Sequence, residues 1–310
     1  MNKKTDKPNL YETITAKIVT ALEDGVIPWA KPWDAVKYGV HRNAVTNRAY
    51  RGLNIMLLNL LALTQGYVDP RWLTFRNAET LGGNVRKGEK GVTVIFWKFL
   101  PKRGQVDDDG LIPEPEEDCG GQEHKVIPFA RAYTVFNVEQ CEGLDLPALE
   151  PVEAVEQETN DLAEVILALP VIRYIGGRAF YSPSSDTITL PPRSAFENLD
   201  LFYGTAFHET VHWTGSPTRL NRTFGKRFGD RDYAFEELVA EIGAAFLGAH
   251  TAIPFEEMRH PEYINSWLEI LKGDSKAIFT AAAKAQNAAD FVLDKAGITG
   301  VLDTPLPAAA

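Results

Sequence analysis

The sequence predicts an α+β protein of two domains, a first domain that mixes helices with strands and a second that joins a small sheet to several helices. Three observations support this prediction. At 310 residues the chain is long enough for two domains of ordinary size. Charge divides unevenly, because residues 1–103 hold 17 Lys and Arg against 8 Asp and Glu, whereas the remainder holds 15 against 34. Helical and strand-like patterns alternate in the first half, while helical patterns dominate the second.

The first domain is expected to span residues 1–145 and to begin with helices. Residues 11–23 predict an amphipathic helix, because apolar residues recur there at helical spacing. Residues 50–65 predict a largely buried helix that stops at Gly66. A shorter helix is expected in the segment that starts at Trp72.

Two strands should complete the first domain. Residues 92–97 and 129–136 are rich in β-branched and aromatic residues, which is typical of strands. Between them, residues 104–125 are acidic, rich in Gly and poor in apolar residues, so an exposed loop is expected there. Residues 146–158, rich in Pro and Glu, are interpreted as the linker to the second domain.

The second domain is expected to span residues 159–310. Residues 161–169 predict a helix, and residues 179–182 and 187–190 flank a Pro-Ser-Ser-Asp turn, which predicts a β-hairpin. Two further helical patterns follow, and the tail over residues 263–296 is helical and rich in Ala.

The most informative local feature is the sequence His-Glu-Thr-Val-His at residues 208–212. Two imidazoles four positions apart lie on one face of a helix, so His208 and His212 can bind a single metal ion. The carboxylate of Glu209 can then accept a proton from a metal-activated water. Five residues therefore predict two metal ligands and a catalytic base. The alternative is a solvated helix that carries these side chains on its wet face.

A second helical pattern, residues 233–247, places carboxylates in an otherwise apolar segment, where an unpaired charge is unfavourable. Glu237 and Glu241 are four residues apart and share a face with Ala240 and Ala244, whose small side chains allow close packing. We interpret Glu237 as the third metal ligand, and Glu241 as the group that holds a ligand His by its other ring nitrogen. This ligand set suits one Zn²⁺ per chain, with Mn²⁺ and Co²⁺ as alternatives.

The basic first part of the chain is what a polyanion-binding domain needs. Aromatic residues alternate with cations along it, and single-strand binders stack bases on aromatic rings while Lys and Arg follow the backbone. The predicted nucleic-acid contacts are Trp29, Lys31, Trp33, Tyr50, Arg51, Trp72, Arg76, Arg86, Lys87 and Lys90. The alternative is that the aromatic residues belong to the core and the cations are solvated.

Composition limits the remaining classes of protein. With 45% hydrophobic and 24% charged residues, the chain has the composition of a soluble globular protein. The longest apolar stretch, residues 53–63, is too short to span a bilayer, and the first residues lead into no apolar signal core. We therefore expect a cytoplasmic protein that makes no membrane contact.

Several longer stretches resemble the N-terminal domain of ArdC-type antirestriction proteins and of plasmid TraC-type primases. They are residues 29–33, 50–54, 71–75, 81–91 and 136–140. Residues 208–215, Arg219-Leu220 and residues 236–241 resemble the zincin-like metallopeptidase half of the same family. The resemblance covers nearly the whole chain, and its motifs are long and occur in the same order.

The resemblance implies a protein of conjugative plasmids and related mobile elements, which binds incoming single-stranded DNA and protects it from host restriction. It implies a first domain that binds single strands and a zincin-like second domain that binds a metal. Whether that second domain cleaves a host protein or serves as a folded support stays open at this point. Two other functions also stay open, a DNA-binding protector with a structural metal and a primase-associated accessory protein.

Overall fold

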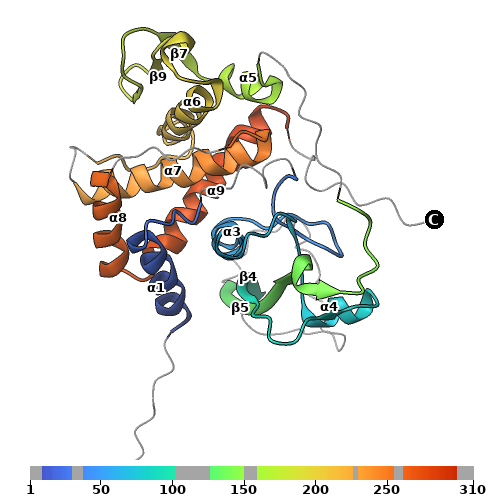
Figure 1. The fold of residues 1–310 in the computed structure, drawn as a ribbon. Coiled ribbons are helices and arrows are strands. Elements are labelled where there is room, and N and C mark those ends of the chain that lie inside the picture. Colours follow the sequence, from blue (N-terminus) through green and yellow to red (C-terminus); the bar gives the residue numbers. More distant parts are fainter. Residues whose placement is uncertain are drawn as a thin grey trace, which may run out of the picture.

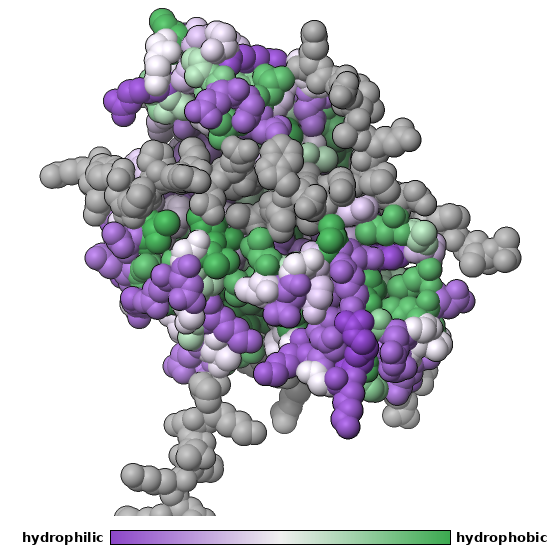
Figure 2. Space-filling view, viewed as in Figure 1, coloured by the Kyte–Doolittle hydropathy of each residue, from purple (hydrophilic) through white to green (hydrophobic). Residues whose placement is uncertain are grey.

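The structure is a computed structural model that describes residues 9–29, 38–101, 126–149, 159–225, 230–254 and 261–298 (Figure 1). The acidic segment 104–125 and most of the expected linker lie outside these ranges. On the face drawn in Figure 2, patches of hydrophilic residues lie next to patches of hydrophobic residues. Over the described residues, no helix combines the length and the apolar character that crossing a bilayer requires.

The first half of the chain is built around a four-stranded sheet. Its strands lie in the order β1 (Arg42–Asn43), β2 (Arg71–Leu73), β5 (Val126–Asn137) and β4 (Val92–Pro101). β1 and β2 are parallel, while β2, β5 and β4 pair antiparallel. The two predicted strands are confirmed. They form one hairpin, in which β4 ends later and β5 begins earlier than the pattern indicated.

The helices of this half begin and end where local chemistry favours it. α1 (Leu10–Glu23) starts at Asn9, whose side chain accepts a hydrogen bond from the backbone amide of Tyr11. α3 (Leu53–Gln65) ends at Gly66, whose φ of 74° lies in the left-handed region that glycine reaches without strain. The predicted helices 11–23 and 50–65 are thereby confirmed.

Smaller elements close the first half. The segment from Trp72 divides into β2 and a short helix, α4 (Phe75–Thr80), which Thr74 caps by accepting from the backbone amide of Asn77. A two-stranded sheet joins β3 (Asn84–Val85) to β6 (Cys141–Glu142), and the 3-10 turn η1 (Val138–Gln140) precedes β6.

The second half starts with α5 (Asp161–Leu167) and a three-stranded sheet in the order β7 (Val171–Tyr174), β9 (Thr187–Leu190) and β8 (Phe180–Ser182). β8 and β9 pair antiparallel, with Phe180 opposite Thr189, so the predicted hairpin is confirmed. β7, which runs parallel to β9, was not predicted. Its side chains are mostly exposed, so it lacks the alternation by which a half-buried strand is recognised.

Four helices follow in this half: α6 (Leu199–Thr214), α7 (Arg231–Thr251), α8 (Pro261–Gly273) and α9 (Ala277–Lys295). A 3-10 turn, η2 (Arg193–Ala195), precedes α6. α6 crosses above α7, and α9 passes behind it (Figure 1). The Ala-rich tail is helical as predicted, but it is two helices. The break follows α8, where Asp274 accepts a hydrogen bond from the backbone amide of Lys276 at 2.8 Å.

Helices α6 and α7 approach each other closely at a glycine. A Cβ atom built on Gly243 of α7 would lie 2.9 Å from a side-chain methyl of Val211 on α6. Ala240 and Ala244 are completely buried beside it. The small residues that the sequence places on this face therefore allow the two helices to approach, which brings residues 208–212 next to Glu237.

Contacts between the two halves join them into one continuous core. α1 packs against α8 and α9, where Thr15 donates from Oγ1 to the carbonyl of Ser275 at 2.6 Å and the Tyr11 ring contacts Phe279. α3 packs near α9, where the Gly52 amide donates to Gln286 Oε1 at 2.8 Å. Within the described residues, the first helix, α1, thus packs against the last two, α8 and α9.

Candidate metal centre

Helix α6 positions both histidines of the motif. It begins at Asn198, whose side chain accepts from the backbone amide of Leu201 at 2.9 Å. From Ala206 onward it is buried on all sides, so the polar residues of the motif lie inside the protein. His208, Glu209 and His212 are 5%, 7% and 8% exposed, which excludes the solvated helix that the pattern left open.

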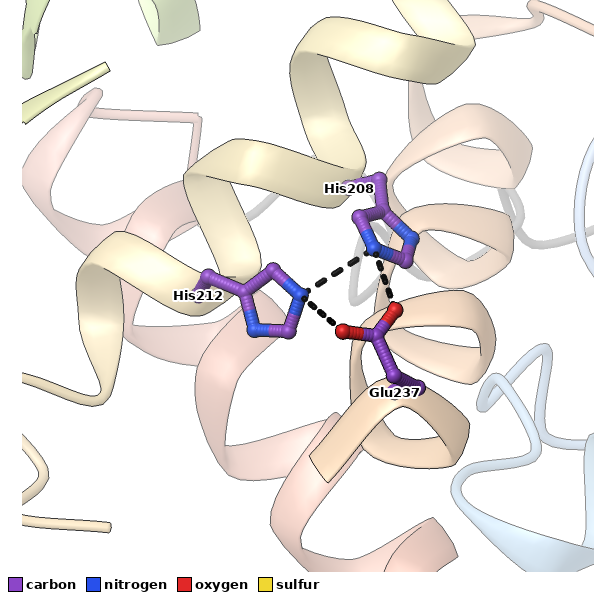
Figure 3. Close-up of side chains that lie close together, drawn as sticks. All are labelled: His208, His212 and Glu237. Carbon is purple, nitrogen blue, oxygen red and sulfur yellow. Dashed lines mark hydrogen bonds and ion pairs between the residues drawn. The ribbon is translucent and has the colours of Figure 1, made fainter. Parts of the chain in front are cut away.

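Helix α7 brings a carboxylate to the two imidazoles (Figure 3). The Nε2 atoms of His208 and His212 are 3.1 Å apart. The two carboxylate oxygens of Glu237 lie 3.3 Å from His208 Nε2 and 3.5 Å from His212 Nε2. Glu241, one turn further along α7, is buried near this group but does not join it.

The geometry of this group fits a metal ion. A tetrahedral ion with ligand distances of about 2.0–2.1 Å separates neighbouring ligand atoms by about 3.3 Å. The measured separations of 3.1–3.5 Å agree with that value. His208, His212 and Glu237 therefore form a buried metal site, with each residue offering one ligand atom.

The electrostatics of the group also attract positive charge. Burial alone disfavours a charged imidazole, yet hydrogen bonds with Glu236 and Glu237 raise the pKa of His212 to about 10. Burial would also lower the pKa of His208, but its hydrogen bond with Glu237 outweighs this effect and raises the pKa of the ring. Burial would raise the pKa of Glu237, but its bonds to both imidazoles hold that pKa well below its usual range. A cation can replace the protons that these rings attract.

Glu209 lies beside the ligands without being one of them. Among the described residues, its buried Oε2 atom has no hydrogen-bond partner. It lines a cleft of about 710 Å³ together with His208, His212 and Glu237. A buried carboxylate oxygen without a protein partner is available to a water molecule in that cleft, which is the position that a general base requires.

The partner of the His212 ring is a residue that the sequence reasoning did not assign. Glu236 Oε1 lies 3.3 Å from His212 Nδ1, the ring nitrogen that faces away from the site. Arg222 donates to both oxygens of Glu236, at 2.8 Å from Nη2 and 3.1 Å from Nε. Arg222 also donates to the Val211 carbonyl at 2.6 Å, which ties the group to the end of α6. A third carboxylate in an apolar helix was the signal that could have pointed to this buried pair.

Glu241 was expected to hold a ligand histidine, and the structure places it differently. Within the described residues, no hydrogen bond joins Glu241 to either ligand imidazole, and its influence on His208 is through charge. Burial raises the pKa of Glu241 to about 7. His208 Nδ1, which was a natural partner for it, is buried and has no hydrogen-bond partner in this part of the chain. The hydrogen-bonding role is met by Glu236, on the other imidazole.

Three aromatic residues that were expected to contact nucleic acid are core residues. Trp29, Tyr50 and Trp72 are 3%, 5% and 0% exposed. The Trp29 ring packs against Trp267, and the Trp72 ring nitrogen donates to Nδ1 of His41 at 3.0 Å. Burial raises the pKa of Tyr50 to about 12. A base cannot stack on a ring that the core already covers, so the structure corrects the stacking role expected for these three side chains.

The cations predicted to contact nucleic acid lie on the surface where they are described. These exposed residues are Arg51, Arg76, Arg86, Lys87 and Lys90. Arg51 forms an ion pair with Asp290 of α9, and Arg86 pairs with Glu89 at 2.9 Å. Exposure is compatible with phosphate contact, and a DNA contact of each cation stays a prediction. Lys31 and Trp33 lie outside the described residues.

Comparison with known proteins adds the family to this geometry. Residues 8–136 match the N-terminal domain of anti-restriction factor ArdC, and residues 163–284 match a zincin-like metallopeptidase. The metal-free crystal structure of the antirestriction protein ArdC from plasmid R388 is 36% identical, with a TM-score of 0.75, over 94% of this chain and 99% of that one. This chain belongs to the ArdC family of antirestriction proteins.

The ArdC likeness also bears on the metal site. A second crystal structure of ArdC from R388 is described as bound to Mn(II), and it matches with 35% identity and a TM-score of 0.74 over 94% of this chain and all of that one. The His–His–Glu site of this chain therefore agrees with the ArdC family as well as with the geometry. The same is true of its α+β fold with a zincin-like half.

DNA primase TraC of Escherichia coli is a further relative. It is 37% identical over an alignment of 302 residues, which covers 94% of this chain but 20% of TraC. A second TraC is 38% identical and is matched over 27% of its length. The ArdC-family chain thus spans between a fifth and about a quarter of the length of these curated relatives.

Proposed function

We propose that this ArdC-family protein protects incoming plasmid DNA from host restriction by binding its single strands and by cleaving a host protein at the metal centre. One observation carries the catalytic part of the proposal. The unpaired carboxylate oxygen of Glu209 lies beside three ligand side chains in an open cleft. A metal that served only to hold the fold together would need neither a base nor a cleft.

The chemistry that fits this arrangement is hydrolysis of a peptide bond. A divalent ion held by His208, His212 and Glu237, of which Zn²⁺ suits the ligands best, would supply Lewis-acid activation of water and of a carbonyl group. Glu209 would accept the proton of the attacking water and deliver it to the leaving amine. Glu236 would keep the His212 ring oriented through its Nδ1 atom.

The cleft supports a peptide as substrate. β8 is an edge strand of its sheet, and Ala179, Phe180 and Tyr181 on and beside it line the cleft. An extended peptide can pair with the free backbone of such an edge and lay alternate side chains into pockets. Further aromatic residues line the cleft, Phe224, Tyr233 and Tyr263, and they favour an apolar side chain next to the bond that is cut.

The single-strand part of the proposal is supported by the charge of the first half. Residues 1–103 carry 17 basic against 8 acidic residues. A basic surface of this kind gives affinity for phosphate that weakens as salt rises.

One comparison tests the catalytic proposal. Glu209→Gln keeps the size of the side chain and all three ligands, so the variant should bind metal like the wild type while losing the base. We expect its protection of a transferred plasmid in a restricting recipient to fall to the level of a plasmid without the gene. His208→Ala, which removes a ligand, is the matched control and should lose metal as well.

The competing function is a DNA-binding protector with a structural metal. The deep burial of all three ligands is the observation that favours it. In that case Glu209→Gln would protect the plasmid fully, while His208→Ala would lose metal, stability and protection together. Full protection by Glu209→Gln would therefore refute peptidase activity as the basis of antirestriction.

A further inference from the structure

The β4–β5 hairpin carries aromatic side chains from the core out to the surface on one face of the sheet. Val94 lies opposite Tyr133, and Phe96 lies opposite Arg131. Because side chains alternate along a strand, these four residues share one face with Val135. Val94 and Val135 are fully buried, whereas Phe96 is 44% exposed. Along β4, this face therefore changes from buried at Val94 to exposed at Phe96, two residues later.

Three side chains form an open cluster where this face emerges. The ring centroids of Phe96 and Tyr133 are 5.6 Å apart, and their planes meet at 76°. The guanidinium carbon of Arg131, an exposed residue, lies 5.8 Å from the Tyr133 ring. Among the described residues, no carboxylate pairs with Arg131. We call Phe96, Tyr133 and Arg131 the hairpin cluster.

The hairpin cluster is held rigidly from below. Asn54 of α3 accepts a hydrogen bond from the Ile95 amide at 2.8 Å and donates to the Ile95 carbonyl at 2.7 Å. It therefore fixes the backbone just before Phe96. The buried Tyr50 ring lies 6.3 Å from the Phe96 ring and supports it from the core. A rigid aromatic surface loses little conformational entropy when a ligand binds to it.

We propose that the hairpin cluster is the surface on which bases of single-stranded DNA stack. This inference rests on the proposed single-strand binding and names the residues that perform it. Bases stack on aromatic rings and on Arg guanidinium groups, and a cation beside the rings meets the phosphate backbone. The two rings are steeply inclined to each other, so they offer separate faces to neighbouring bases. A duplex hides its base faces and should bind more weakly.

The position of the hairpin separates DNA contact from metal chemistry. Figure 1 shows β4 and β5 beneath α3, at the opposite end of the view from α6. A strand that lies on the hairpin cluster therefore leaves the metal cleft accessible to a protein substrate.

The test is a titration of a fluorescent oligothymidine with the full-length protein, followed by anisotropy. We expect Phe96→Ala and Tyr133→Ala each to weaken affinity by about 5- to 150-fold, the loss of one stacked base. Tyr133→Phe should bind like the wild type, because stacking needs the ring and not the hydroxyl. Arg131→Ala should reduce the slope of log affinity against log salt by about 0.7.

Phe75→Ala is the matched control. Phe75 is also an exposed aromatic residue of the first half, but it lies on α4 rather than on the hairpin. Its loss should leave affinity unchanged, and thermal melting should show that all variants are folded. Wild-type affinity in both Phe96→Ala and Tyr133→Ala would overturn the hairpin cluster while leaving single-strand binding intact. A wild-type protein without single-strand affinity would instead overturn the proposed function, and this inference with it.

Discussion

Glu236 is buried between two cationic side chains, His212 and Arg222. Through His212 Nδ1 it sets the orientation of a metal ligand without contacting the metal position itself. We expect Glu236→Gln to weaken metal affinity by about ten- to a hundredfold, which is usual for the outer partner of a ligand histidine. Competition with a chelator of known affinity measures the change.

The control for this variant is Glu241→Gln, because Glu241 lies on the same helix and is equally buried but makes no hydrogen bond to a ligand among the described residues. A larger loss in Glu241→Gln than in Glu236→Gln would contradict the geometry. Glu236→Ala should in addition lower the free energy of unfolding by about 3–5 kcal/mol, because it leaves Arg222 charged and unpaired inside the core.

The pH dependence of metal binding follows from the same residues. The pKa of His212 is raised from 6.5 to about 10, so without an ion its proton contributes stability that is complete below about pH 6.5 and is lost as pH rises towards 10. A bound ion takes the place of that proton. We therefore expect the rise in melting temperature on adding metal to grow as pH increases from 6.5 to 9. Melting curves with and without metal at several pH values measure it, and a pH-independent rise would contradict this account.

At this scale the sequence could predict the three ligands but not their surroundings. The spacing of His208 and His212 is set by helix geometry alone, and Glu237 stood out as a carboxylate in an apolar helix. The choice between Glu236 and Glu241 depends on how α7 is rotated against α6, which only packing decides. Trp29 and Trp72 looked like stacking residues because composition cannot distinguish a ring that is buried from one that is exposed.

At the scale of elements, the crossing of α6 and α7 holds the metal site together, since the ligands are divided between the two helices. We expect Gly243→Ala to push the helices apart at Val211, because the new methyl would lie 2.9 Å from a Val211 methyl. The free energy of unfolding should fall by about 1–3 kcal/mol, which is typical of overpacking, and metal affinity should fall with it. Thermal melting and metal titration measure the two effects.

Gly204→Ala is the matched control, because Gly204 lies on α6 and a Cβ atom there meets nothing within 4 Å. That variant should be unchanged or slightly more stable, since Ala favours a helix over Gly by about 1 kcal/mol. Val211→Ala should partly rescue Gly243→Ala by making room for the methyl. A Gly243→Ala protein with the melting temperature of the wild type would contradict this prediction, because it would show that α6 and α7 leave room for the added methyl group.

The elements themselves were largely predictable, and two exceptions have separate causes. The position of α1 was expected from its helical hydrophobic periodicity. The positions of α3, α6 and α7 were expected from long, largely apolar segments, and those of β4 and β5 from β-branched and aromatic residues. β7 was missed because it is short and mostly exposed, so its register comes from pairing with β9 rather than from its own pattern. The break between α8 and α9 was missed although Gly273, Asp274 and Ser275 are typical of a turn, because the helical pattern on both sides was interpreted as one helix.

At the scale of the whole molecule, one core crosses the boundary between the two matched halves. We expect the metal-loaded chain to unfold in a single transition, and a chelator to lower that one transition as a unit. Differential scanning calorimetry measures it. Two transitions, of which only one responds to the chelator, would show that the halves fold independently, as the sequence-based division at residues 146–158 predicts.

The contact of α1 with α8 and α9 has a consequence for how the protein is made. α1 leaves the ribosome long before α8 and α9 are synthesised, yet it packs against them, with Thr15 bonded to a carbonyl 260 residues later. Until then α1, which carries the buried Ile14 and Ile18, lacks the contacts that α8 and α9 make with it. Folding should therefore finish only after synthesis of α9, and incomplete chains should need a chaperone to keep this helix from aggregating.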